Sequence, residues 1–220
     1  MQIVIGDILK PDDLAAIRTA LDGVPFIDGR ETAGFAARQV KDNRQADARD
    51  RGLDPVREMV ARRILENDLF RIAVRPKRLS PLLFSRYEPG MAYGSHVDDA
   101  LMSGMRTDVA FTLFLEDPES YEGGELVIES ASGEDAVKLT AGAMVAYPAT
   151  TLHHVAEVTR GRRQVVAGWA RSYIRDPAHR ELLFDLDTAR RAIFARDGKS
   201  KEFDLMSKSL ANLLRMWAED

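Results

Sequence analysis

From about residue 72 to residue 170, short apolar segments alternate with glycine-containing turns. Segments of this length, bounded by pairs such as Gly-Gly, Ser-Gly and Ala-Gly, are typical of antiparallel strands. We expect strands over residues 72–74, 81–87, 109–115, 126–128, 136–139, 143–147 and 164–169. Many short strands at such intervals predict a β-sandwich or barrel, and the jelly roll of the cupins is one such form.

The flanking segments have a different period. Residues 2–5 read as a short strand, and Pro11 then opens a helix to about Leu21. Apolar positions at helical spacing predict a helix over residues 54–68 and two more after residue 177, separated at Gly198. Within the strand-rich part, residues 109–115 are apolar on both faces, which indicates a central, buried strand.

Composition narrows the class of protein. The chain has 220 residues, 45% of them hydrophobic and 30% charged, as expected for one sizeable soluble domain or a domain with an appendage. A net charge of −4 gives no reason to expect a nucleic-acid partner. No segment has the pattern of a signal peptide or a membrane span, so a cytoplasmic protein is the default expectation. The sequence leaves the oligomeric state open. Because cysteine is absent, metal ligands must be His, Asp or Glu.

Three of the four histidines fall at two places, in His96-Val97-Asp98 and in His153-His154. In an extended strand, residues i and i+2 point to the same side, so His96 and Asp98 can reach one ion. Two histidines and one carboxylate, with other coordination positions open, are the ligand set of non-haem Fe(II) oxygenases. His-x-Asp alone is a weak signal, since polar residues on the wet face of a strand give the same pattern.

The residues around these histidines form two longer motifs. The first has Tyr-x-x-Gly-x-x-Tyr-x-x-His-x-Asp spacing, and the second has Leu-His followed by Val-x-x-Gly-x-Arg. Their members are Tyr87, Gly90, Tyr93, His96 and Asp98, then Leu152, His153, Val158, Gly161 and Arg163. The set, with Gly123-Gly124 between, resembles the prolyl-4-hydroxylase-like Fe(II)/2-oxoglutarate dioxygenases, and more closely the bacterial PKHD-type hydroxylases. The specific motifs cover roughly residues 75–175.

The resemblance implies a site and an activity. His96, Asp98 and His153 would hold Fe(II), Arg163 would pair with the distal carboxylate of 2-oxoglutarate, and the Tyr87 hydroxyl would help to hold this cosubstrate. Tyr93 is assigned to the pocket lining, the choice between Tyr87 and Tyr93 as the cosubstrate contact is left open, and a place in the aromatic core is the alternative for both. The enzyme would hydroxylate a small-molecule or peptidyl substrate while converting 2-oxoglutarate to succinate and CO2, and L-ascorbate is an optional further cofactor.

Adjacent residues compete for two of these roles. The Leu-His register of the family favours His153 over His154, and neighbours on a strand face opposite ways. By the same alternation, Arg162 and Arg163 point to opposite sides, and the resemblance implies that Arg163 is the one that faces inward. His179, at the start of the C-terminal helices, is expected to be an ordinary surface histidine.

The predicted fold is mainly β with flanking helices (α+β). A dioxygenase domain is expected over residues 1–176. It consists of N-terminal helices and a core over about residues 72–176, which is a double-stranded β-helix, or jelly roll. Residues 177–220 form a C-terminal helical appendage whose apolar stripes favour internal packing over a partner site.

Residues outside the two motifs are assigned supporting or structural roles. The polar segment 35–52 is interpreted as a solvated loop, with a substrate contact as the alternative. Trp169 is expected to pack behind the site, and Asp99, Arg106 and Asp108 to support the ligands or to form loop ion pairs.

Two other classes of protein compete with the oxygenase. One is a non-catalytic regulatory protein of the same fold that binds metal or 2-oxoglutarate. The other is a zinc hydrolase, against which stands the lack of a glutamate base beside a histidine pair, as in His-Glu-x-x-His.

Overall fold

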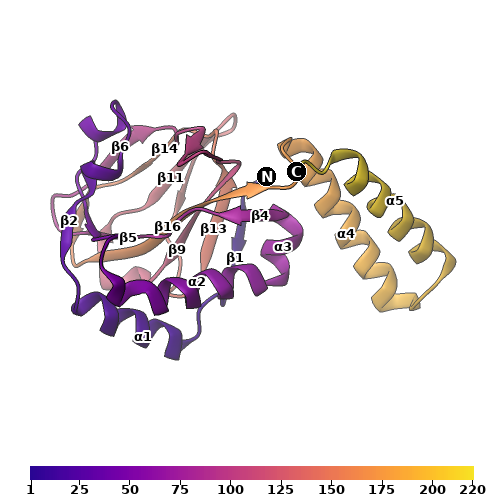
Figure 1. Ribbon diagram of the computed structural model, residues 1–220, viewed down its shortest axis with the longest axis horizontal. Coiled ribbons are helices and arrows are strands. Elements are labelled where there is room, and N and C mark those ends of the chain that lie inside the picture. The colour runs from indigo at the N-terminus through magenta and orange to yellow at the C-terminus, as the bar shows by residue number, and fades with distance from the viewer.

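The computed structural model describes residues 1–220 as a β-rich body from which a pair of helices projects (Figure 1). Its largest sheet is antiparallel throughout, in the order β1-β13-β9-β16-β5-β3-β2, with β4 also paired to β16. In that order the strands are β1 (Ile3–Ile5), β13 (Met144–Pro148), β9 (Val109–Phe114), β16 (Arg163–Ser172), β5 (Leu83–Tyr87), β3 (Arg44–Ala46) and β2 (Phe26–Asp28), and β4 is Pro76–Leu79.

A smaller antiparallel sheet faces the first. Its order is β12 (Gly133–Val137), β11 (Leu126–Ser130), β14 (His153–Val155) and β6 (Tyr93–His96). An apolar cluster between the two sheets joins Ile128 and Val155 of the small sheet to Val145 and Val165 of the large one. Two antiparallel sheets closed over one core form the jelly-roll arrangement expected from the sequence. Two short strand pairs complete the β structure, β7 (Leu101–Met102) with β8 (Met105–Arg106) and β10 (Glu122–Gly123) with β15 (Val158–Arg160).

Three helices cover the outer face of the large sheet (Figure 1). They are α1 (Pro11–Asp22), α2 (Asp54–Glu66) and α3 (Asp68–Val74). Along β9 every residue is buried, because Phe111 and Leu113 pack in the core under these helices whereas Ala110 and Phe114 pack between the sheets. The prediction of a central strand that is buried on both faces is therefore confirmed.

One predicted strand is wrong. Ile72-Ala73-Val74 forms the last turn of α3, so the β core begins at Pro76 and not near residue 72. The side chain of Asn67 accepts a hydrogen bond from the Phe70 amide and starts this helix, and Arg75 ends it in the left-handed conformation. A buried apolar run of three residues suits a helix as well as a strand, and the cap at Asn67 decides between them.

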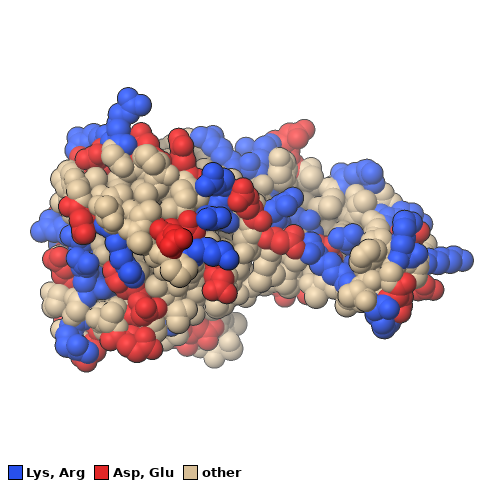
Figure 2. Space-filling model, turned by 90° about the horizontal axis from the view of Figure 1, so that it is seen from below, with Lys and Arg blue, Asp and Glu red and all other residues tan.

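The C-terminal segment forms the two predicted helices, α4 (Pro177–Asp197) and α5 (Lys201–Trp217), which pack on each other and extend away from the β body (Figures 1 and 2). Gly198 ends α4 as expected. Leu183 and Leu210 form a small core with Ile174 at the base of the pair. The chain then returns to the body, where Ala218 pairs with Ile174. The helix pair is therefore held at its base by both of its ends.

Asp187 of α4 is a second attachment point. It is 2% exposed and lies near three guanidinium groups, those of Arg75 at the end of α3 and of Arg190 and Arg191 on its own helix. Burial lowers the pKa of Arg75, and the Asp187 carboxylate opposes that effect. The carboxylate thus balances charge that would otherwise be concentrated between α3 and α4.

We expect Asp187→Asn to lower the free energy of unfolding by about 1–3 kcal/mol, since charged hydrogen bonds are lost inside a buried contact. Urea unfolding followed by circular dichroism measures the change. Asp185→Asn, on the exposed side of the same helix, is the control and should be close to neutral. Equal stabilities of the two variants would contradict a structural role for Asp187.

The face of the molecule seen in Figure 2 carries no large field of one sign. Acidic and basic side chains are mixed over the face of the body and of the helix pair seen in Figure 2. No helix combines the length and hydrophobicity that crossing a bilayer requires.

Candidate active site

A cavity lies between the two sheets and opens to solvent. Its walls are the inward-facing residues of the strands, which alternate with residues that pack under the helices. On β16 the inward residues are Arg163, Val165, Ala167 and Trp169. The mouth of a β-barrel is a common position for a ligand site.

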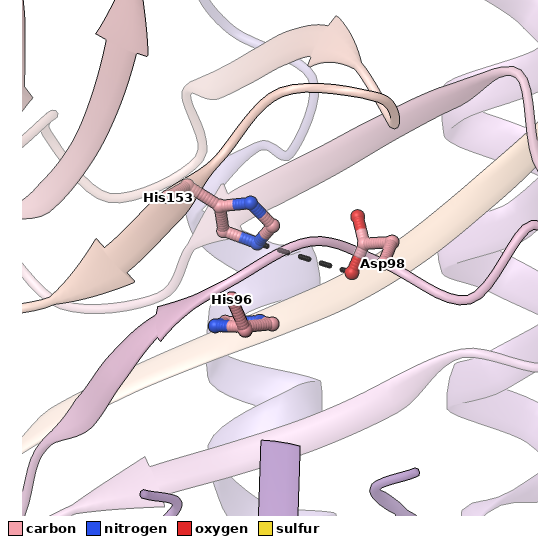
Figure 3. Close-up of side chains that lie close together, drawn as sticks. All are labelled: His96, Asp98 and His153. Carbon is pink, nitrogen blue, oxygen red and sulfur yellow. Dashed lines mark ion pairs between the residues drawn. The ribbon is translucent and has the colours of Figure 1, made fainter. Parts of the chain in front are cut away.

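His96, Asp98 and His153 meet on one side of this cavity, and each offers a ligand atom within 4.8 Å of the others (Figure 3). The two histidines are direct cross-strand neighbours, His96 at the end of β6 and His153 at the start of β14. Nε2 of His153 is 3.9 Å from Oδ1 of Asp98. Because β6 ends at His96, Asp98 is presented by the following loop, and not by the strand as the two-residue spacing predicted.

Both imidazole rings are oriented in the same way. Nδ1 of His96 lies 2.9 Å from the carbonyl oxygen of Gly94, and Nδ1 of His153 lies 3.0 Å from that of Thr151. A carbonyl oxygen can only accept a hydrogen bond, so Nδ1 carries a proton in both rings, and in a neutral ring Nε2 then has the free lone pair. Burial, together with the neighbouring His153, lowers the pKa of His96 to about 4. His96 is therefore a neutral nitrogen donor at physiological pH.

Asp98 lacks a partner for one of its oxygens. Its Oδ2 is buried and makes no hydrogen bond, and burial raises the pKa of the carboxyl group, an effect that His153 opposes. A buried carboxylate without a partner is costly, and a bound cation removes that cost. Two imidazoles and one carboxylate, with no sulfur, suit Fe(II) with open coordination positions. The side chains present thus fit the metal that the sequence implied.

Arg163 is a buried cation on the wall of the same cavity. It is 1% exposed, has no carboxylate within ion-pair distance, and its Nε makes no hydrogen bond. The guanidinium lies over the rings of Tyr87 and Phe114, at 5.0 and 5.6 Å from their centroids. Arg162, its neighbour, is exposed, as strand alternation predicted. A buried, unpaired guanidinium fits the carboxylate of a bound dicarboxylic acid.

Two glycines allow the chain to pass close to Arg163. Gly123 and Gly124 have φ of +71° and +69°, a region that favours glycine. A Cβ on Gly124 would lie 3.0 Å from Cδ of Arg163, and one on Gly123 would lie 1.9 Å from the carbonyl oxygen of Glu157. The Gly-Gly motif is therefore required by tight packing, of Gly123 on the Glu157 backbone and of Gly124 on the aliphatic part of Arg163.

Tyr121 is a site residue that sequence reasoning missed. Its hydroxyl is buried without a hydrogen-bond partner, burial raises its pKa, and Arg163 opposes that shift. Tyr121 immediately precedes the Glu122-Gly123-Gly124 turn. Its place next to this glycine motif was the only feature of the sequence that pointed to a role near the site. Tyr121 is not part of the cavity lining, so its hydroxyl supports Arg163 from behind the cavity wall.

The two tyrosines of the first motif occupy different places. Tyr87 on β5 is the cross-strand neighbour of Arg163, and burial raises its pKa while Arg163 lowers it. Tyr93 stacks on the ring of His96, with centroids 3.7 Å apart. Tyr87 is therefore beside the guanidinium, and Tyr93 is beside the candidate metal ligands.

The solvated-loop interpretation of residues 35–52 is wrong for the middle of that segment. Lys41, Asn43 and Gln45 are 5%, 2% and 3% exposed and all line the cavity. Residues 44–46 form β3, which pairs with β5, and Lys41 pairs with Tyr93 beside β6. Polar composition predicted exposure, but these side chains face the interior of a ligand cavity.

The remaining residues also have clear positions. Trp169 lies in the cavity wall itself, not behind it, and its indole N–H makes no hydrogen bond. Arg106 pairs with Asp108 at 2.7 Å and with Glu219 at 2.7 Å, which is the ion-pair alternative. Asp99 lines the cavity. His154 points away from the cavity and lies near Glu129 and Glu134, and His179 stacks on Trp217.

Comparison with known proteins defines the class first. Residues 82–171 match the family model of the 2OG-Fe(II) oxygenase superfamily. The fold resembles a Pseudomonas putida prolyl-4-hydroxylase, with a TM-score of 0.54 at 22% identity over 78% of this chain and 92% of that one. It also resembles HygX from Streptomyces hygroscopicus, solved with nickel, 2-oxoglutarate and hygromycin B, with a TM-score of 0.56 at 17% identity over 79% of this chain and 84% of that one. The protein has the fold of a 2-oxoglutarate- and Fe(II)-dependent oxygenase.

The full-length relatives define the family. A PKHD-type hydroxylase of Picosynechococcus is 53% identical over 98% of each chain, and one of Acaryochloris marina is 50% identical over the whole of both. Residues 178–219, the helix pair, match the PKHD-type hydroxylase C-terminal domain. The chain belongs to the PKHD-type hydroxylases, and it is an oxygenase enzyme of hydroxylase type.

Proposed function

We propose that His96, Asp98 and His153 bind Fe(II), and that Arg163 binds the distal carboxylate of 2-oxoglutarate in the same cavity. The observation that carries this proposal is a pair of buried, unpartnered charges, the carboxylate of Asp98 and the guanidinium of Arg163. Both line one cavity, so a metal ion and a dicarboxylate bound together would satisfy both.

The chain's own residues then have separate tasks. The carbonyl oxygens of Gly94 and Thr151 hold the two imidazole rings with Nε2 directed at the metal position. Tyr87 and Tyr121 flank Arg163 and would keep the bound carboxylate in a largely water-free pocket. When bound, Fe(II) and 2-oxoglutarate would activate O2, so that one oxygen atom enters succinate as 2-oxoglutarate loses CO2 and the other hydroxylates a C–H bond of the substrate.

The substrate is proposed to be a small molecule or a peptidyl side chain that enters through the open mouth of the cavity. L-Ascorbate is proposed as an auxiliary reductant on the family resemblance alone. A cytoplasmic location is also part of the proposal, because 2-oxoglutarate is a central metabolite there.

Substrate-independent turnover tests the assignment as an enzyme. Purified protein supplied with Fe(II), 2-oxoglutarate and O2 should form succinate slowly, and an accepted substrate should raise that rate. Mass spectrometry should then find a product heavier by one oxygen atom. Tight binding of 2-oxoglutarate without any succinate would instead support the regulatory alternative.

A further inference from the structure

Lys41 is a charged residue in the cavity to which the proposed chemistry gives no task. The charged side chains of the lining are those of Lys41, Asp98, Asp99 and Arg163, with His96 and His153 beside them. If the metal takes Asp98 and 2-oxoglutarate takes Arg163, the Lys41 ammonium is left without a ligand.

The position of Lys41 is fixed by the backbone. The Asp42 amide donates to the Ala92 carbonyl at 2.8 Å, and the Gly94 amide donates to the Val40 carbonyl at 2.8 Å. A Cβ on Gly94 would lie 2.8 Å from Cβ of Val40, so this close approach requires a glycine. The segment therefore lies directly against the strand that ends in His96.

The ammonium is held on one side and open on the other. Nζ donates to Oγ1 of Thr32 at 3.1 Å, and the Thr32 hydroxyl in turn donates to Oε1 of Gln45 at 2.7 Å. The Gln45 amide then donates to the Ser85 hydroxyl on β5 at 3.2 Å. An ammonium has three donors, so this chain of hydrogen bonds uses one and leaves two for a ligand.

No carboxylate neutralises this charge directly. Lys41 makes no ion pair within 4.0 Å and is only 5% exposed. Burial lowers the pKa of Lys41 to about 8, and the more distant Asp98 and Asp28 oppose that shift. Nζ also lies 5.0 Å from the ring centroid of Tyr93, the tyrosine that stacks on His96. A cation held this way is a receptor for an anion.

We propose that Lys41 binds a carboxylate of the substrate and thereby places the substrate beside the metal ligands. This inference rests on the proposed function, and it specifies the substrate as an anion. Thr32 and Gln45 act through Lys41 as positioning residues, since their linked hydrogen bonds fix the place of its ammonium group.

The test uses trifluoroacetate as the probe, followed by ¹⁹F NMR with the anaerobic protein loaded with Fe(II) and saturated with 2-oxoglutarate. Paramagnetic Fe(II) broadens the fluorine signal only of probe that binds close to the metal, and Zn(II)-loaded protein supplies the diamagnetic baseline. We expect broadening for trifluoroacetate and little for the neutral trifluoroacetamide.

Lys41→Met should weaken probe binding about tenfold or more, as expected for loss of a charged hydrogen bond, and Lys41→Arg should restore most of it. Lys77→Met is the matched control, because Lys77 also lies over a tyrosine ring, that of Tyr173 at 5.6 Å, but outside the cavity. That variant should broaden the signal as the wild type does.

The experiment distinguishes failure of the Lys41 proposal from failure of the proposed function. Broadening that persists in Lys41→Met, or that is absent from wild-type protein carrying bound 2-oxoglutarate, would overturn the role of Lys41 and leave the proposed function intact. A wild type that develops no Fe(II)–2-oxoglutarate charge-transfer band overturns the proposed function, and the inference falls with it.

Discussion

His153→Ala is expected to lose Fe(II) binding and turnover by well over about 100-fold, while His154→Ala keeps most of both. Replacing a residue that only supports a metal ligand costs about 10–100-fold in metal affinity, so loss of a ligand itself should cost more. His153 is buried beside His96 and Asp98, whereas His154 faces the opposite side of β14. Anaerobic Fe(II) titration and succinate release measure the two effects separately.

The adjacent histidine is a strict control, because both variants change the same strand by the same atoms. Circular dichroism should show both folded. If His154→Ala were inactive and His153→Ala active, the strand register would be shifted by one residue, and the assignment of the inward face of β14 would be wrong.

Arg163→Met is expected to bind Fe(II) normally and 2-oxoglutarate about 30-fold or more weakly. Truncating one partner of a buried charged pair costs about 2–5 kcal/mol, and each 1.4 kcal/mol corresponds to about tenfold in affinity. The guanidinium lies over the Tyr87 ring, and Arg163 is only 1% exposed. In the variant, water therefore has poor access to the carboxylate and replaces the lost hydrogen bonds poorly. Anaerobic titration of 2-oxoglutarate, followed by the metal-to-ligand charge-transfer band, gives the dissociation constant.

Arg162→Met supplies the control, since Arg162 is exposed on the other side of the same turn. It should bind 2-oxoglutarate nearly as the wild type does. If Arg163→Met also bound it normally, the cosubstrate would be held by another group, and Lys41 would be the first to examine because it is the other buried cation of the cavity.

Patterns in the sequence predicted most strands of the β core, and the family motif was needed to select the candidate metal ligands. Alternation along a strand puts Arg162 and Arg163 on opposite faces, and the motif spacing selects Arg163 as the inward one. The two-sided apolar run at residues 109–115 likewise predicted the centre of the large sheet, because a strand covered on both faces has no polar face. These features depend on neighbours a few residues apart.

Only the tertiary structure determines the positions of Lys41, Gln45 and Tyr121. Their polar composition is that of a surface, but pairing of residue 41 with Tyr93 and of β3 with β5 brings the first two into the cavity. Tyr121 lies near Arg163 where Gly124 packs closely on both side chains. Residues 72–74 are a different case, because the cap at Asn67 that produced a helix is a local signal in the sequence. Contacts between segments far apart in the chain leave no periodicity in either segment, and sequence patterns therefore do not report them.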